Sequence, residues 1–182
     1  MPSPTMTPNK VSLEAIKALR DKTSASLNDV RAALQASGGN EAKALEWLRQ
    51  RGASIAQRRQ GRATGQGRIE AYVHHDGRIG ALVEVNCETD FVARTPEFLQ
   101  FCRDLAMQVA ATEPSYLTAE EAPAGTTLSA EERKAQCLLE QPFVKDQGMT
   151  VGDLLKALIA KTGENVVIKR FVKFGLGETS GS

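Results

Sequence analysis

Residues 68–85 read RIEAYVHHDGRIGALVEV, and their pattern predicts the fold of the second half of the chain. Apolar and polar residues alternate on both sides of Asp76 and Gly77, a pair typical of two-residue hairpin turns. We therefore predict two antiparallel strands that share one apolar face. The residues predicted on that face are Ile69, Ala71, Val73, Ile79, Ala81, Val83 and Val85.

Three helices are predicted after the hairpin, each from a capping residue and an apolar stripe. Thr95 caps the first helix, and Ser129 begins a second that runs through Leu139. Thr150 begins the third helix, which Gly163 ends. The first helix has the longest stripe, which consists of Phe98, Phe101, Cys102, Leu105 and Val109.

A last strand is predicted over residues 165–174. Its expected apolar face holds Val166, Ile168, Val172 and Phe174, and only Arg170 interrupts it. Strands and helices come in separate groups, without a β-α-β alternation. We therefore predict an α+β core domain with an antiparallel sheet over residues 68–182.

Before residue 52, an apolar period of three to four residues predicts three short helices. Ser12, Ser26 and Asn40 are the expected N-caps, and Gly52 is the expected end of the third helix. We predict a three-helix partner-binding domain at residues 10–52 and a disordered tail at residues 1–9. The residues expected to face its core are Leu13, Ile16, Leu19, Leu27, Val30, Ala33, Leu34, Ala44, Leu45 and Leu48, with Trp47 alongside.

Charge is distributed unevenly along the chain. Residues 1–68 hold 12 Lys and Arg against 5 Asp and Glu, a net +7, whereas residues 69–182 hold 11 against 17, a net −6. We read residues 53–67 as a basic connector. RNA binding by this connector is an alternative function, although no aromatic residues or known reading motif accompany the arginines. Between positions 49 and 68 the arginines are Arg49, Arg51, Arg58, Arg59, Arg62 and Arg68.

Several function classes are not expected from this composition. The chain has 182 residues, an odd number of cysteines (three) and two histidines, with no spacing typical of zinc ligands and no phosphate-binding loop of the GTPase type. We therefore expect a cytoplasmic protein without a metal, a cofactor or direct nucleotide binding. Cys87, His74 and Asp90 are residue types that could form a catalytic set with a cysteine nucleophile. His74 is predicted at a hairpin tip, however, so we expect no covalent catalysis.

One segment carries a specific resemblance. Residues 82–94 read LVEVNCETDFVAR, which resembles the signature of the elongation factor Ts family, the nucleotide exchange factors of elongation factor Tu. The resemblance continues at residues 139–146 (LEQPFVKD), at 163–165 (GEN) and at 170–171 (RF). In the first domain it rests on Leu19, Arg20, Thr23, Asp29, Ala33, Leu34, Gly38, Gly39, Asn40, Ala44, Leu48, Arg49 and Gly52.

The resemblance implies a ubiquitin-associated-like first domain and a protein partner, elongation factor Tu. It also implies that Asp90 and Phe91 enter the GTPase beside its magnesium site, with Phe91 as a wedge. From the residues alone, Phe91 and Val92 packing under the helix at Phe98 is the other interpretation. The residues that the resemblance predicts at the partner interface are Thr89, Asp90, Phe91, Val92, Leu19, Arg20, Thr23 and Asp29.

The chain departs from the family pattern in two places. Ser24 and Ser26 stand where the first loop of the family usually has glycines. Between Tyr116 and Leu138 there are only about twenty residues, where similar members carry extra helical sequence. A short member of this kind most simply supplies a second lobe by dimerising, so we predict a homodimer through the C-terminal sheet. The alternative is that the helix predicted at residues 151–161 covers the last strand within one chain.

Overall fold

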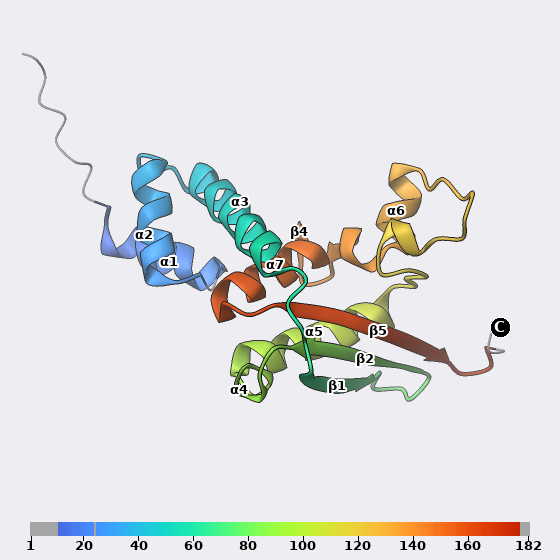
Figure 1. The fold of residues 1–182 in the computed structure, drawn as a ribbon. Helices are drawn as coiled ribbons and strands as arrows, with labels where there is room; N and C mark the ends of the chain where they lie inside the picture. Colours follow the sequence, from blue (N-terminus) through green and yellow to red (C-terminus); the bar gives the residue numbers. More distant parts are fainter. Residues whose placement is uncertain (1–10, 24, 179–182) are drawn as a thin grey trace, which may run out of the picture.

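The first part of the chain forms three helices in the computed structural model, which describes residues 11–23 and 25–178. They are α1 (Leu13–Thr23), α2 (Leu27–Ala36) and α3 (Glu41–Arg59), as Figure 1 shows. The predicted caps are confirmed: the side chain of Ser26 accepts from Asp29 N and that of Asn40 from Lys43 N. The predicted disordered tail lies outside the described residues.

Helix α3 is longer than predicted. It continues through Gly52 to Arg59, so the prediction that Gly52 ends the helix is wrong, and residues 53–59 of the predicted connector are helical. Gly52 is buried where α3 meets α7 (Val151–Thr162), and a Cβ there would lie 3.7 Å from the Lys156 carbonyl oxygen. The helix does not stop at this glycine because packing on a neighbouring helix outweighs its low helix propensity.

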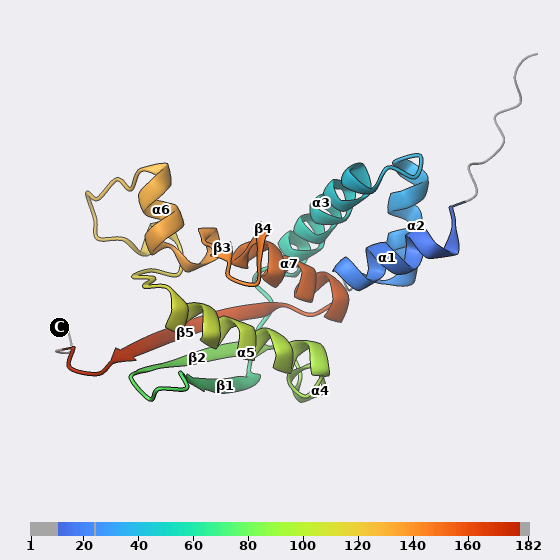
Figure 2. The ribbon, with the colours of Figure 1, turned by 180° about the vertical axis from the view of Figure 1, so that it is seen from behind.

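A three-stranded antiparallel sheet forms the second part of the chain. Its strands are β1 (Gln66–Val73), β2 (Ile79–Cys87) and β5 (Val166–Gly175), in the order β1-β2-β5. Helix α5 (Pro96–Ala111) covers one face of the sheet, as the view from behind in Figure 2 shows. The predicted α+β class is confirmed.

Strand β1 turns its predicted apolar face toward solvent. Ile69 is 64% exposed and Val73 66% exposed, whereas Tyr72 packs against the core. The reason is the register, because Tyr72 pairs with the buried residue Ala81 and therefore shares its face. The pairing leaves the three apolar residues of β1 on the face that α5 does not cover.

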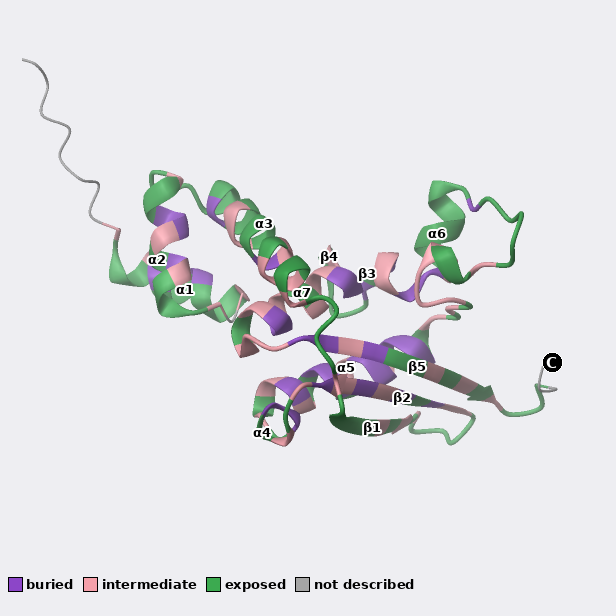
Figure 3. Cartoon of the chain, viewed as in Figure 1, coloured by how far each residue is buried: buried purple, intermediate pink, exposed green. Residues whose placement is uncertain are grey.

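Strand β5 also differs from the prediction, because its face changes along its length. Val166 and Ile168 are buried, but Val172 and Phe174 are exposed (Figure 3). A bulge causes the change: Val85 pairs with Ile168, while the preceding Glu84 pairs with Arg170. The extra residue in β5 reverses the faces that follow it.

The remaining elements lie between β2 and β5 in the sequence. The helix predicted from Ser129 through Leu139 ends earlier, at Gln136, and both predicted capping residues, Ser129 and Thr150, form capping boxes. Gly163 ends α7 with a φ of 72°, as predicted. The elements in this part are α4 (Asp90–Ala93), η1 (Ala119–Glu121), α6 (Ala130–Gln136), η2 (Leu138–Glu140), the two-stranded sheet of β3 (Pro142–Phe143) and β4 (Asp146–Thr150), and α7.

Two separate cores result. One lies among α1, α2 and α3, and the other lies between α5, α7 and the three-stranded sheet. Helix α3 serves both, because Trp47 and Leu48 pack on the first core while Ile55 and Ala56 pack on the second. Three leucines predicted in the first core are exposed instead, namely Leu13, Leu27 and Leu45.

Candidate functional site

Phe91 projects into solvent from the short helix α4. Its side chain is 81% exposed, whereas the next two residues, Val92 and Ala93, are each only 9% exposed and belong to the core. The alternative interpretation, with Phe91 packed under the helix at Phe98, therefore does not hold for Phe91. This exposure leaves the aromatic ring of Phe91 accessible for contact with a partner.

Both ends of the turn that carries Phe91 are anchored. Strand β2 leads into the turn and ends at the buried residue Cys87. On the other side the Thr95 side chain accepts from Phe98 N at 3.3 Å and so caps α5. These anchors fix the position of Phe91 relative to the sheet and to α5.

The neighbours of Phe91 are held by local contacts. Asp90 forms an ion pair with Arg94, 3.1 Å between Oδ2 and Nη2. The hydroxyl of Thr89 accepts from Val92 N at 3.4 Å and donates to Glu164 at 2.6 Å. Sequence reasoning gave Glu164 no role, although it lies in the GEN segment that resembles the family.

The predicted interface residues of the first domain differ widely in exposure. Arg20 is exposed, but Leu19 is only 1% exposed and lies in the three-helix core. The Thr23 hydroxyl donates to Leu19 O at 2.7 Å. Asp29 is half-buried and accepts from Arg51 at 2.5 Å. Leu19, like the buried residue Val92, is therefore limited to supporting its exposed neighbours.

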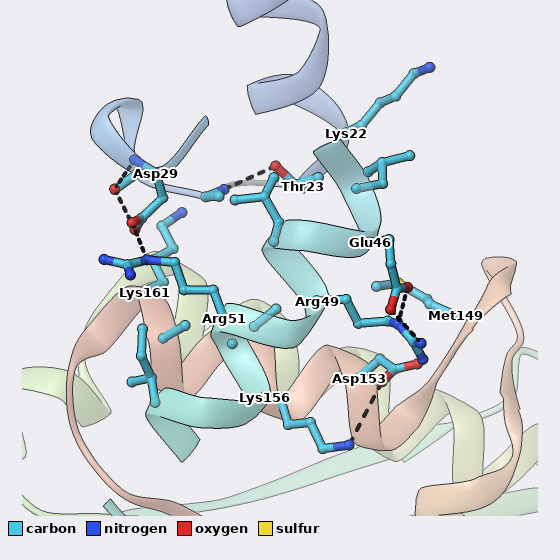
Figure 4. Close-up of a pocket in the computed structure, with 18 of the residues that line it drawn as sticks. Lys22, Thr23, Asp29, Glu46, Arg49, Arg51, Met149, Asp153, Lys156 and Lys161 are labelled. Atoms are coloured by element: carbon cyan, nitrogen blue, oxygen red, sulfur yellow. Dashed lines mark hydrogen bonds and ion pairs between the residues drawn. The ribbon is translucent and has the colours of Figure 1, made fainter. Parts of the chain in front are cut away.

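A groove of about 760 Å³ lies between the three-helix part and the core. Figure 4 shows Thr23 and Asp29 on one side of it and Asp153 and Lys156 of α7 on the other. Phe91 is not among the described residues that line this groove. The structure therefore leaves the two predicted contact clusters as separate surfaces.

Most arginines of the basic stretch are paired within the chain. Arg62 lies 3.5 Å from Glu88, and Arg68 lies 2.6 Å from Glu70. Arg49 and Arg51 pair with acidic residues of the helical part. The RNA-binding alternative depends on the three arginines of the connector, Arg58, Arg59 and Arg62, and within residues 11–23 and 25–178 only Arg62 of these three forms an ion pair.

The possible catalytic set of Cys87, His74 and Asp90 is not assembled, because His74 lies far from Cys87. His74 follows β1 at the hairpin end, whereas Cys87 pairs with Gln66 at the opposite end of the same two strands. Burial, and secondarily the negative charge of Glu164, raises the pKa of the Cys87 thiol to about 11. A thiol with so high a pKa is a poor nucleophile at neutral pH. The described residues also contain no group of three or more His, Cys, Asp or Glu side chains placed to hold a metal ion.

Comparison with known proteins identifies the family. The sequence model described as Elongation factor TS matches residues 9–136, which include the three helices and the turn with Phe91. The chain belongs to the elongation factor Ts family. No helix among the described residues combines the length and apolarity needed to cross a membrane.

Individual members of the elongation factor Ts family match almost end to end. Elongation factor Ts of Rubrobacter xylanophilus is 46% identical over 193 residues, covering 90% of this chain and 98% of the relative. That of Solidesulfovibrio magneticus is 44% identical, covering 92% and 98%. That of Carboxydothermus hydrogenoformans is 43% identical, covering 92% and 90%.

Proposed function

We propose that this chain is a guanine nucleotide exchange factor that binds elongation factor Tu with GDP and promotes GDP release. In this proposal Phe91 enters the GTPase and stabilises a form in which the phosphate and magnesium site is distorted. The observation that carries it is the 81% exposure of Phe91 on an anchored turn. Membership of the elongation factor Ts family supports the choice of partner.

The energetics require more than this one side chain. A GTPase that binds GDP with nanomolar affinity and loads it at roughly 10⁶ per molar per second releases it at about 10⁻³ per second. A ~10⁴-fold acceleration needs about 5.5 kcal/mol of preference for the distorted form. Burying one Phe side chain contributes about 1.5 to 3 kcal/mol, so a second contact surface is needed.

The three-helix part is the second surface in this proposal. The exposed side chain of Arg20 is available for direct contact. Thr23 and Asp29 contribute through the half-exposed rim of the groove, and Asp90 contributes beside Phe91. Leu19 and Val92 support these contacts from the two cores. No step of this mechanism needs a covalent bond, a metal or a cofactor in this chain.

The direct test is stopped-flow release of labelled GDP from elongation factor Tu, with and without this chain. We expect the release rate to rise with the concentration of the chain and to reach a plateau. A rate that does not change at any concentration would contradict the proposal. Binding of RNA with a steep salt dependence would instead favour the RNA-binding alternative.

We further propose that the active form is a homodimer through the three-stranded sheet. The face of the sheet that α5 does not cover, which is turned toward the viewer in Figure 1, carries a group of exposed apolar residues. The ion pair between Glu84 and Arg170, 2.6 Å, lies among them and leaves the face without an unpaired central charge. A neutral apolar face suits a second copy related by a two-fold axis. The apolar residues are Ile69, Val73, Leu82, Val172 and Phe174.

A further inference from the structure

Two carboxylates link the turn that carries Phe91 to the loop between α7 and β5. One belongs to the loop and accepts hydrogen bonds from the turn, and the other belongs to the turn and accepts a hydrogen bond from the loop. Glu164 of the loop accepts the backbone N–H of Thr89 at 3.0 Å and the Thr89 hydroxyl at 2.6 Å. Glu88 of the turn accepts the backbone N–H of Asn165 at 2.6 Å. Each segment therefore supplies a charged acceptor for a backbone donor of the other. Hydrogen bonds to ionised acceptors are roughly twice as strong as neutral ones.

The end of the connector, at Arg62, contacts both the loop before β5 and the turn with Phe91. The side-chain amide of Asn165, which is 6% exposed, donates to the carbonyl oxygen of Arg62 at 2.8 Å. The guanidinium of Arg62 lies 3.5 Å from the carboxylate of Glu88. The end of the connector, the turn with Phe91 and the loop before β5 are thus held by one network. We define the contacts among Arg62, Glu88, Thr89, Glu164 and Asn165 as the double-carboxylate clamp.

Glu164 has a direct effect on the helix that carries Phe91. Thr89 is the N-cap of α4, and its hydroxyl oxygen accepts from Val92 N. Because the hydroxyl proton points to Glu164, the oxygen lone pairs remain free for that cap bond. Helix α4 has only four residues, and a helix of one turn is not stable by itself. Its position therefore depends on contacts of this kind from outside the helix.

We infer that Glu164 is a positioning residue for Phe91 that holds the N-cap of α4 through Thr89. This inference rests on the proposed exchange function, because a fixed position of Phe91 matters only if Phe91 enters the GTPase. Glu164 does not itself need to touch the GTPase. Its removal should leave Phe91 present and exposed but no longer held in one orientation, so that part of the binding energy is spent on ordering the turn.

The test compares three single variants of the full chain. Glu164→Ala removes both acceptor bonds to Thr89, and Glu164→Gln keeps one carbonyl acceptor and the side-chain volume. Glu132→Ala is the matched control, because Glu132 likewise accepts a backbone N–H at a helix start, that of Ser129 at 2.8 Å. Glu132 belongs to α6, which lies far from α4 along the sheet in Figure 1.

The first measurement is amide hydrogen exchange in the chain alone, without a partner. In Glu164→Ala we expect the amides of Thr89 and Val92 to exchange at least tenfold faster, while those of Val83 and Val85 in the sheet keep their rates. Glu132→Ala should leave all four unchanged. An unchanged hydrogen-exchange rate of the Thr89 amide in Glu164→Ala would overturn the inference, whatever the rate of GDP release is.

The second measurement is the release of labelled GDP from elongation factor Tu across a range of chain concentrations. Glu164→Ala should raise the concentration needed for half the maximal rate about tenfold, Glu164→Gln should recover part of this loss, and Glu132→Ala should behave as the wild type. Wild-type release by Glu164→Ala, despite a fast Thr89 amide, would overturn the positioning role. Full-rate release by Phe91→Ala would instead overturn the wedge role of Phe91, and the positioning role with it, whereas a wild-type chain that releases no GDP would overturn the proposed function.

Discussion

Gly52 of α3 lies against Ala160 of α7, so closely that a Cβ on Gly52 would stand 4.0 Å from the Cβ of Ala160. The two helices therefore meet at a pair of small residues. This contact joins the helix that completes the three-helix part to a helix of the core. It sets how far Thr23 and Asp29, on one side of the groove, lie from α7 on the other side.

The contact between Gly52 and α7 leaves room for one methyl group and no more. Gly52→Ala should raise the free energy of unfolding by about 0.5 to 1 kcal/mol, because alanine is the better residue inside a helix. Gly52→Leu should lower it by about 1 to 3 kcal/mol, because the larger side chain forces α3 away from α7. Urea denaturation of both variants measures the difference. Equal effects of the two substitutions would contradict the close approach.

Phe91→Ala should retain the fold but lose exchange activity. The side chain is largely exposed, so we expect the free energy of unfolding to change by less than about 0.5 kcal/mol. Loss of one buried Phe at the partner should slow stimulated GDP release by about ten- to a hundredfold. Circular dichroism and stopped-flow release are compared on the same samples. An unfolded variant, or one of full activity, would refute the wedge.

Removal of residues 1–52 should leave a folded core that binds elongation factor Tu more weakly. Among the described residues, those that form the larger core or pack against it begin at Ile55. Because the cut falls inside α3, a second truncation that begins at Asn40 keeps this helix whole and serves as the control. Isothermal titration calorimetry measures the affinity of both truncations for elongation factor Tu. If both truncations bind as tightly as the full chain, the three-helix part has another purpose.

Leu82→Lys should abolish the proposed dimer without unfolding the monomer. Leu82 is 41% exposed in the single chain, but a charge there would be buried against a second sheet. Leu13→Lys, at a position 77% exposed in α1, is the matched control and should leave the dimer intact. Sedimentation over a dilution series reports the mass. A wild-type particle that stays at 19.6 kDa up to high micromolar concentration would rule out the dimer.

The three cysteines should resist thiol reagents in the native chain. All are buried, and burial raises the pKa of Cys87 to about 11 and that of Cys102 to about 12. At pH 8 only about one Cys87 in a thousand is then a thiolate. Because the unfolded thiols ionise near pH 9, these raised pKa values predict that stability falls as the pH rises from about 9 toward 11. Rapid native labelling at pH 8 would contradict this.

Local signals predicted much of the fold. The caps at Ser26, Asn40 and Thr150 are predictable because an N-cap depends on a residue and its neighbours three positions on. The hairpin at Asp76 was found for the same reason. The turn with Phe91 carries a family signature, whereas the apolar character of Phe91 does not predict its solvent exposure.

Only the tertiary structure decided the features that depend on contacts between distant residues. Gly52 continues a helix because α7 packs against it, and the bulge opposite Glu84 turns Val172 outward although the alternation of β5 looks regular. Glu164 and Thr89 are 75 positions apart, and no local pattern relates a carboxylate to a backbone N–H at that distance. Short-range signals determine where helices and strands begin, but register, burial and long-range hydrogen bonds follow from the packing of the whole chain.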